Sequence, residues 1–471
     1  MELRPRRRLG SRPQRRRRNP GAADDSDGVD RISGLPDDLL LLVLARLRSA
    51  RDAARTSVLS TRWSDLWRRL PELYFRNTSP GALDAALAKV AVPKLSVLDI
   101  AETRCNNRNS FSAAEVASLL RNAARLNPME LRVEVPLKVK DRGGAVELPC
   151  FAGATSINLE LLGGDLSLTL PAQGGDFPVL EILSIGSCLI NSTSALISRC
   201  PNLRMLKLNQ CLNDGSLTVH STTIEELTVN NQVTGIRSVD IEAPVLKKFI
   251  FSAQMHEDYT ISITAPMVTN QSWSYGWHGF DVRIDQTWCL FHLKSETDES
   301  GYMFLSLDIL RLAHFASHER KLHEIYKLPE CDALELYLEE SEHFYGGMVL
   351  NILRMCNGIQ RLKLVSNYWF CDAEACPLNC PCDQPQNWTS HDTLLSDLEE
   401  VEIVNFEGSS HEVDFLKLLF RCATLTKVIV RLDSKVSTRS KGCKEIYNFF
   451  KANPSVECNI YQRRGKEVVY A

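Results

Sequence analysis

Four cysteines in the C-terminal third of the chain could in principle bind a metal ion. Cys371, Cys376, Cys380 and Cys382 are close together, and His391 follows them. Structural zinc sites use four thiolate or imidazole ligands, most often cysteine pairs with two to four residues between them. Here the gaps are four, three and one residues, and the last is too short for such a pair. We interpret the segment as a cysteine-rich loop, keep zinc as the alternative, and expect no cofactor.

No other pattern indicates catalysis. The sequence has no glycine-rich phosphate loop, no GxSxG elbow and no HExxH zinc motif. His314 and His318 have helical spacing, but no glutamate follows the first of them, so we expect a surface position. Cys200, Cys356 and Cys422 each stand three residues before a predicted strand, where a small buried thiol fits a tight turn. The sequence therefore predicts a protein that is not itself an enzyme.

Composition excludes a wholly disordered chain and a membrane protein. The 471 residues are 44% hydrophobic and 24% charged, a balance typical of globular proteins, and no apolar run approaches the roughly 18 residues that span a bilayer. The fifteen cysteines are expected to stay reduced, because the N-terminus lacks the apolar stretch of a secretory signal. We therefore expect a nuclear or cytoplasmic protein.

The N-terminal tail, residues 1–29, is basic and is expected to be disordered. Nine of its first 18 residues are arginine, whereas the rest of the chain has a net charge of −11. Such clusters are typical of nuclear import signals or weak phosphate-binding patches, although a solvated tail without a role is equally compatible. The candidate import residues are Arg6, Arg7, Arg8, Arg15, Arg16, Arg17 and Arg18.

A small helical module is predicted next, over residues 30–76. Pro36 suits a first helical turn, and Asp37 and Asp38 lie where the helix dipole favours carboxylates. Apolar residues spaced one, three, one and three apart predict one broad helical stripe from Leu39 to Leu47. A second helix is expected over about 50–59 and a third around Trp63 and Trp67. This module has more apolar surface than three short helices can bury, so those two tryptophans either meet a partner or pack onto the next domain.

The module closely resembles the F-box of plant F-box/leucine-rich-repeat proteins. The resemblance rests on LPDDLL from Leu35, VLARL from Val43 and ARTSVLSTRWSDLWRRLP from Ala54. It implies docking onto a Skp-type adaptor that in turn holds a cullin, with Arg62, Arg68 and Arg69 near the acidic adaptor. The adaptor-binding residues that it implies are Leu35, Pro36, Leu40, Val43, Leu44, Leu47, Leu59 and Trp63.

The remainder of the chain repeats a Leu-x-x-Leu-x-Leu pattern. The central residues Leu183, Leu206, Leu227 and Phe249 are 23, 21 and 22 residues apart, within the range of leucine-rich repeats. Weaker copies end at positions 100, 133, 159, 364, 403 and 430, and Ala265-Pro266 repeats Ala243-Pro244. The fold class expected is α/β: a three-helix F-box, then a repeat solenoid over residues 77–440 with a curved parallel sheet and outer helices.

Two segments interrupt or close these repeats. The cysteine-rich stretch, about residues 366–393, is predicted to be an insertion. Residues 441–471 are predicted to form a capping helix and strand, and they resemble the FBD-like C-terminal region of plant F-box repeat proteins. The aromatic stretch from Trp273 to Trp288 could belong to a recognition surface, but Trp273 falls on an inward strand position, which favours a core role.

These observations lead to one hypothesis and two alternatives. The resemblance implies a substrate-recognition subunit of an SCF-type (Skp-cullin-F-box) ubiquitin ligase, whose concave repeat surface binds a target protein that the sequence does not identify. The alternative is a repeat scaffold that binds a partner without assembling a ligase. Nucleic-acid binding by the arginine tail is disfavoured, because the acidic body repels phosphates.

Overall fold

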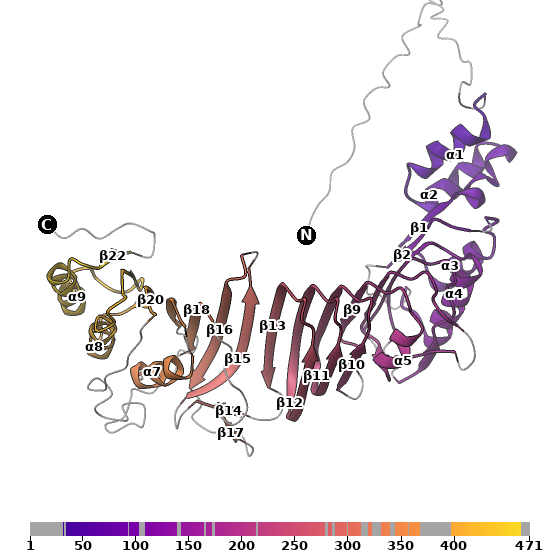
Figure 1. Ribbon diagram of the computed structural model, residues 1–471. Coiled ribbons are helices and arrows are strands. Elements are labelled where there is room, and N and C mark those ends of the chain that lie inside the picture. Colours follow the sequence, from indigo (N-terminus) through magenta and orange to yellow (C-terminus); the bar gives the residue numbers. More distant parts are fainter. Residues whose placement is uncertain are drawn as a thin grey trace, which may run out of the picture.

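The chain folds into a small helical module followed by a long, mostly parallel β-sheet (Figure 1). The computed structural model describes residues 32, 34–92, 94–102, 109–138, 143–163, 166–171, 175–212, 215–277, 281–284, 288–298, 300–311, 319–322, 331–339, 344–356, 358–367 and 397–462.

The helical module begins with two α-helices, as predicted, but its third part differs. Proline caps the first helix, and Asp37 and Asp38 occupy its first turn. Instead of a third α-helix, the residues around Trp63 and Trp67 form short 3-10 helices, with Trp63, Leu66 and Trp67 buried. The elements are α1 (Asp37–Ala45), α2 (Ala50–Arg55), η1 (Thr56–Val58), η2 (Thr61–Trp63) and η3 (Leu66–Arg69).

The main sheet has 19 strands among the described residues, and its order follows the chain closely. Parallel pairing runs from β1 to β2, β3, β5, β7, β9, β11, β12 and β13, and again from β16 to β18, β19, β20, β21 and β22. The strands of the first run are β1 (Glu72–Arg76), β2 (Val97–Ala101), β3 (Glu130–Pro136), β5 (Ser156–Leu162), β7 (Ile182–Gly186), β9 (Met205–Asn209), β11 (Glu226–Glu242), β12 (Lys248–Thr264) and β13 (Asn270–Trp277). Those of the second run are β16 (Met303–Arg311), β18 (Ala333–Glu339), β19 (Arg361–Asn367), β20 (Glu400–Phe406), β21 (Lys427–Leu432) and β22 (Glu457–Tyr461).

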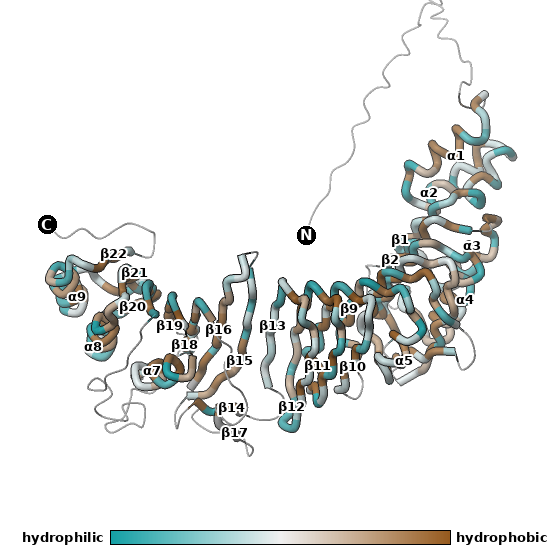
Figure 2. The backbone as a smooth tube through the Cα atoms, viewed as in Figure 1, coloured by the Kyte–Doolittle hydropathy of each residue, from teal (hydrophilic) through white to brown (hydrophobic). Residues whose placement is uncertain are grey.

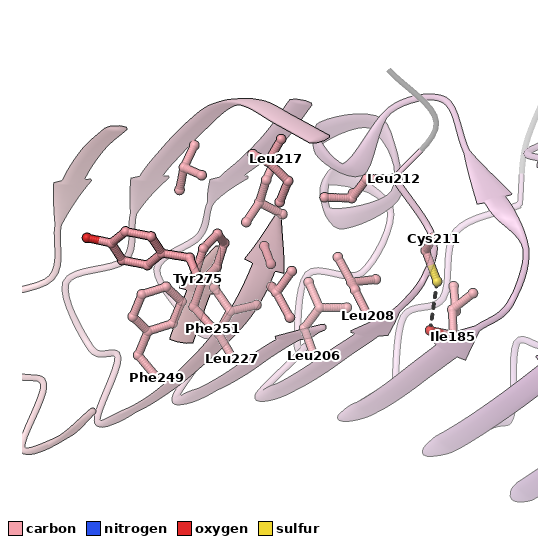
Figure 3. Close-up of a cluster of buried hydrophobic side chains, with 14 of the residues drawn as sticks. Ile185, Leu206, Leu208, Cys211, Leu212, Leu217, Leu227, Phe249, Phe251 and Tyr275 are labelled. Atoms are coloured by element: carbon pink, nitrogen blue, oxygen red, sulfur yellow. Dashed lines mark hydrogen bonds between the residues drawn. The ribbon is translucent and has the colours of Figure 1, made fainter. Parts of the chain in front are cut away.

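The repeat spacing predicts the register of these strands correctly. Leu183 lies opposite Leu206, Leu206 opposite Leu227, and Leu227 opposite Phe249. Because alternate side chains of a strand point to the same face, these residues and their neighbours two positions on form one continuous apolar row. Figure 3 shows part of that core, where the Cys211 thiol donates to the Ile185 carbonyl at 2.9 Å.

The sheet is not entirely parallel, which corrects the expected architecture. β15 (Trp288–Thr297) is antiparallel to both β13 and β16, and it separates the two parallel runs. Short strands β14 (Asp281–Arg283) and β17 (Glu319–Lys321) pair beside it. An alternating apolar pattern is the same for both strand directions, so the sequence could not show this reversal.

A second, shorter ladder accompanies the first parallel run. β4 (Ala145–Glu147), β6 (Ser167–Thr169) and β8 (Leu189–Ile190) form a separate parallel sheet, and β10 (Ser216–His220) pairs with the C-terminal part of β11. The strands β11 and β12 are long, 17 residues each, because each contributes to both ladders.

Helices connect several of the repeats. α4 begins with a capping box in which Ser112 and Glu115 bond each other's backbone N–H, and α8 has the same arrangement at Ser409 and Glu412. A helix and a strand lie where the sequence predicts the C-terminal pair. The connecting helices are α3 (Pro80–Leu87), α4 (Ala113–Arg125), α5 (Thr193–Ser198), α7 (Gly346–Met355), α8 (Ser410–Leu419) and α9 (Lys441–Ala452).

Candidate functional site

The helical module exposes an apolar surface. Of the fourteen large hydrophobic side chains described as exposed, seven lie between residues 32 and 59, and Figure 2 shows hydrophobic residues along α1. Leu42, Val58 and Leu59 have exposed fractions of 61%, 88% and 64%. We call the following set the apolar face: Ile32, Leu39, Leu42, Val43, Leu47, Val58 and Leu59.

The spacing of leucines in α1 explains how one helix both packs and displays apolar residues. Leu40 and Leu44 are one turn apart and are buried, with exposed fractions of 0% and 1%. Leu39 and Val43 are also one turn apart, but lie on a face of the helix that no other described element covers. A helix that is apolar on two faces needs a second packing partner, and the module supplies only one.

The structure divides the eight predicted adaptor-binding residues into two groups. Leu40, Leu44 and Trp63 are buried in the module, so we correct their assignment from docking surface to core. Val43, Leu47 and Leu59 belong to the apolar face. Leu35 is half-buried and Pro36 is exposed at the start of α1.

Sequence reasoning missed Leu39, Leu42 and Val58, which the structure places on the apolar face. Helical spacing carried the signal for two of them, because Leu39 and Leu42 are three residues apart on the side opposite the buried pair. Val58 carried no such signal, since its exposure depends on the chain leaving α2 as a 3-10 turn.

Ion pairs fix the start of α1 against the 3-10 helices. Asp37 accepts from Arg62 at 2.7 Å and from Arg69 at 3.2 Å, and the Arg62 hydrogen bond holds the pKa of the Asp37 carboxyl below its usual range. Arg68 pairs with Asp65 at 3.0 Å. All three arginines predicted to lie near an acidic adaptor therefore have carboxylate partners within the module.

The module is joined firmly to the first strands. The Arg48 guanidinium lies 4.9 Å above the Tyr74 ring and donates to its hydroxyl at 3.2 Å. The Pro71 carbonyl accepts from the Ser96 N–H at 2.8 Å. Trp63 and Trp67 share one hydrophobic cluster with residues of β1, which favours the packing interpretation of both tryptophans over the partner interpretation.

The sheet displays a surface of different chemistry. A groove of about 610 Å³ runs across β1, β2, β3, β5, β7, β9 and β11, and charged and amide side chains line it. Arg76 and Asp99 form a two-bond pair there, at 2.8 and 2.7 Å. The polar side chains of the groove are Arg76, Asp99, Arg132, Glu134, Asn158, Glu160, Ser184, Lys207, Asn209, Thr228 and Asn230.

Glutamines at the repeat spacing extend this polar surface. The Gln210 side-chain oxygen accepts from the Gln232 N–H at 3.1 Å, and Gln254 donates to the Gln232 side-chain oxygen at 3.2 Å. Gln232 donates in turn to Ser252 at 2.7 Å. The sheet thus presents donors and acceptors already held in place by their neighbours.

The aromatic stretch from Trp273 to Trp288 contributes mainly to the core. Trp288 and Tyr275 have exposed fractions of 0% and 2%. Trp273 packs edge-on against Phe249, with 4.7 Å between ring centroids, as its inward register predicts. These contacts favour the core interpretation over a recognition surface.

The three turn cysteines behave as structural thiols. Cys200 and Cys356 are buried and Cys422 is half-buried. Burial raises the pKa of Cys200 to about 12 and that of Cys422 to about 11, while the neighbouring Cys331 thiol and burial raise the pKa of Cys356. Thiols with such pKa values are poor nucleophiles at neutral pH.

Several sequence predictions lie outside the described residues. These are the arginine clusters of the tail, the cysteine cluster with His391, and the pair His314 and His318. Within the described ranges, no group of three or more histidine, cysteine, aspartate or glutamate side chains has the geometry of a metal site. No helix of the described part is both long and apolar enough to cross a bilayer.

Comparison with protein families identifies both regions. Residues 32–74 match the F-box domain, and residues 116–268 match the family described as "FBD-associated F-box protein At5g56370, LRR repeats". The chain belongs to the plant F-box/leucine-rich-repeat family. It is thus a mixed α/β protein in which an F-box precedes a leucine-rich-repeat region.

Its relatives are Arabidopsis thaliana proteins. The putative F-box protein At3g58960 is 29% identical over 55% of this chain, and the putative F-box protein At1g67390 is 29% identical over 52% of it. The matched regions span 59% and 54% of those relatives, so the chain covers a little over half of their length. The probable FBD-associated F-box protein At1g32375 is 22% identical over 91% of this chain and 99% of its own length.

Proposed function

We propose that this F-box protein is a non-catalytic substrate-recognition subunit of an SCF-type ubiquitin ligase. The apolar face of the F-box docks a Skp-type adaptor, which binds a cullin, and the repeat region holds a target protein. The observation that carries the proposal is the concentration of half of the exposed large hydrophobic side chains within 28 residues of the F-box. Nothing else in the described part of the chain has a comparable density of uncovered apolar side chains.

The docking residues follow from exposure. Leu39, Leu42, Val43 and Leu47 form the α1 part of the contact, and Val58 and Leu59 form the η1 part. Burial of each of these side chains stabilises the complex by up to about 1.5–3 kcal/mol. The buried residues Leu40, Leu44 and Trp63 act indirectly, because they hold α1 against η2 and η3.

The repeat region supports target binding through its polar groove. The groove side chains are charged or carry amides, so we propose a target surface that is itself polar and charged on both signs. Proximity then does the chemical work: a target held on the repeats has a high effective concentration near the ubiquitin-loaded enzyme. We place the complex in the nucleus or cytoplasm, with the arginine clusters of the tail as the import signal.

Co-elution with the adaptor and cullin tests the proposal. The full chain, mixed with a Skp-type adaptor and a cullin N-terminal domain, is expected to elute as one ternary complex in size-exclusion chromatography. The Leu39→Glu/Leu42→Glu variant is expected to leave the chain in a separate peak. Val233→Glu is the matched control, because Val233 is exposed by 70% but lies in the repeat region.

The scaffold alternative makes the opposite prediction. If the wild-type chain elutes apart from the adaptor under conditions where a known F-box protein co-elutes, the ligase role is wrong. Co-elution that survives Leu39→Glu/Leu42→Glu but is lost in Val233→Glu would move the adaptor contact to the repeats.

A further inference from the structure

The second ladder of the repeat region ends at an open strand edge. Ser216 in β10 lies opposite Ser238 in β11, and Ser238 lies opposite Thr260 in β12. β13 pairs only with the N-terminal part of β12, from Lys248 to Met255. In the described part of the chain, no strand pairs with the other side of residues 260–264.

Main-chain groups point out of this edge. The Thr264 carbonyl accepts from the Ala243 N–H at 3.0 Å, so the main chain of Thr264 faces β11. Successive residues of a strand direct their N–H and C=O groups to opposite edges. The N–H and C=O groups of Ile261 and Ile263 therefore point away from β11, toward the open side.

The apolar row beneath the ladder is also incomplete at this edge. Val239 and Ile241 of β11 are each 1% exposed, because strands cover them on both sides. Ile261 and Ile263 continue the same row in register with them. Ile261 is 36% exposed and Ile263 is half-buried, so one more strand would complete the row.

The edge is open because the repeat changes its pairing here. At the repeat spacing of 22 residues, Val282 of β14 is the counterpart of Thr260. β14 does not continue the ladder; it pairs with β15 and β17 instead. The reversal of β15 thus removes the strand that would otherwise cover β12.

We propose that the edge of β12, residues 259–264, binds an extended segment of a partner protein by β-strand addition. The partner segment has apolar residues at alternate positions, which pack beside Ile261 and Ile263, and its main chain bonds the free groups of those two residues. The sequence Tyr-Thr-Ile-Ser-Ile-Thr contains no charge and no proline, the devices that usually protect exposed edges from pairing.

Other occupants fit the edge less well. The chain's last nine residues extend about 30 Å at most, whereas eight strand positions of about 4.8 Å separate β12 from β22. The N-terminal 31 residues are rich in arginine and lack an alternating apolar pattern. A second folded copy would have to insert a whole sheet beside strands that continue past β12, whereas a partner segment inserts one strand (Figure 1).

Peptide binding to the full chain tests this proposal. The probe is a fluorescein-labelled peptide of residues 257–266, because β12 itself covers the equivalent edge of β11 in the same register. Fluorescence anisotropy is expected to show saturable binding. Ile261→Pro/Ile263→Pro is expected to weaken it at least tenfold, because proline removes the two outward N–H groups and keeps the bonds to β11. The matched control Ile261→Val/Ile263→Val retains these groups and is expected to bind within about twofold of wild type.

Hydrogen exchange on the unmodified chain provides a second readout that does not depend on a variant folding. The Ile261 and Ile263 amides are expected to exchange rapidly in the free chain and at least tenfold more slowly with the peptide. The Ser262 and Thr264 amides, which face β11, are expected to be protected in both states.

Three results would overturn the proposal: no saturable binding, equal binding by the proline variant, or protection of Ile261 and Ile263 in the free chain. A dimer that the proline variant abolishes would assign the edge to a second copy instead. The test does not involve the adaptor, so its outcome is independent of the proposed ligase role.

Discussion

The F-box and the repeat sheet bury their leucines with very different completeness. Seven large hydrophobic residues are exposed within residues 32–59, and the other seven are scattered over the rest of the described chain. In the sheet, every repeat lies between two others, so the apolar row of one strand is covered by the next. The F-box has no such neighbour on its α1 side, and its uncovered leucines identify the surface that needs a partner.

The polar surfaces differ in the same sense. Arginines of the F-box are used internally, as Arg62 and Arg69 bond Asp37 to hold α1 in place. On the sheet, charged and amide side chains such as Lys207 and Asn230 line an open groove. We infer that apolar contact dominates binding at the F-box, and that polar contact dominates binding at the repeats.

The largest expected effect separates the F-box core from its surface. Trp67→Ala is expected to lower the free energy of unfolding of the F-box by about 3–5 kcal/mol, because Trp67 is buried beneath α1. Leu42→Ala, at an exposed position, is expected to change it by less than about 0.5 kcal/mol. Urea unfolding followed by tryptophan fluorescence measures both. Equal losses in the two variants would mean that Leu42 belongs to the core.

Acid pH is expected to destabilise the repeats. Burial lowers the pKa of His411 to about 4, and Phe344 and Tyr345 pack edge-on against its ring. The unfolded chain takes up this proton near pH 6.5, before the folded chain does. Stability is therefore lost as the pH falls from about 6.5 to about 4, by up to about 3 kcal/mol.

The neighbouring Glu412 has the opposite pH dependence. Burial raises the pKa of its carboxyl, so its contribution to stability falls as the pH rises. Comparing wild type with His411→Gln at each pH isolates the histidine. Parallel unfolding curves of the two proteins between pH 4 and 7 would show that His411 is not responsible.

Adaptor affinity is expected to depend on single exposed residues of the F-box. Leu42→Glu is expected to weaken binding of a Skp-type adaptor by about 2 kcal/mol, which is roughly 30-fold in Kd, because a carboxylate would be desolvated in an apolar contact. Val233→Glu is expected to leave Kd unchanged. Isothermal titration calorimetry on the full chain gives both values. An unchanged Kd for Leu42→Glu would remove α1 from the contact.

The smallest effect is expected on the polar groove of the sheet. Lys207→Ala is expected to change the free energy of unfolding by less than about 0.5 kcal/mol and to leave adaptor affinity unchanged, because Lys207 is exposed. Urea unfolding and the same titration measure these quantities. A loss above 1 kcal/mol in stability would show that the groove residues support the sheet rather than a ligand.

Much of the sheet could be predicted from the sequence, because spacing encodes register. The intervals between Leu183, Leu206, Leu227 and Phe249 are confirmed as strand-to-strand pairings. The reversal at β15 could not be predicted, since Trp288–Thr297 has the same alternation that a parallel strand would have. The second ladder was equally hidden, because its strands lack the Leu-x-Leu pattern.

The F-box site was predicted only in part for a related reason. The apolar stripe of α1 was evident, but the sequence did not show which side of it faces the module. Leu40 and Leu44 were therefore grouped with Val43 and Leu47, although the first two are core and the last two are exposed. The third helix was predicted as α-helical because spacings of three and one residues from Trp63 to Leu70 also fit two short 3-10 turns.

Hydrogen exchange of the full chain, with and without a Skp-type adaptor, tests the central claim most directly. The account predicts that the adaptor slows exchange in residues 37–47 and 56–59, which carry most of the apolar face, and leaves the strands β5 to β12 unchanged. Protection of the sheet strands without protection of α1 and η1 would contradict it.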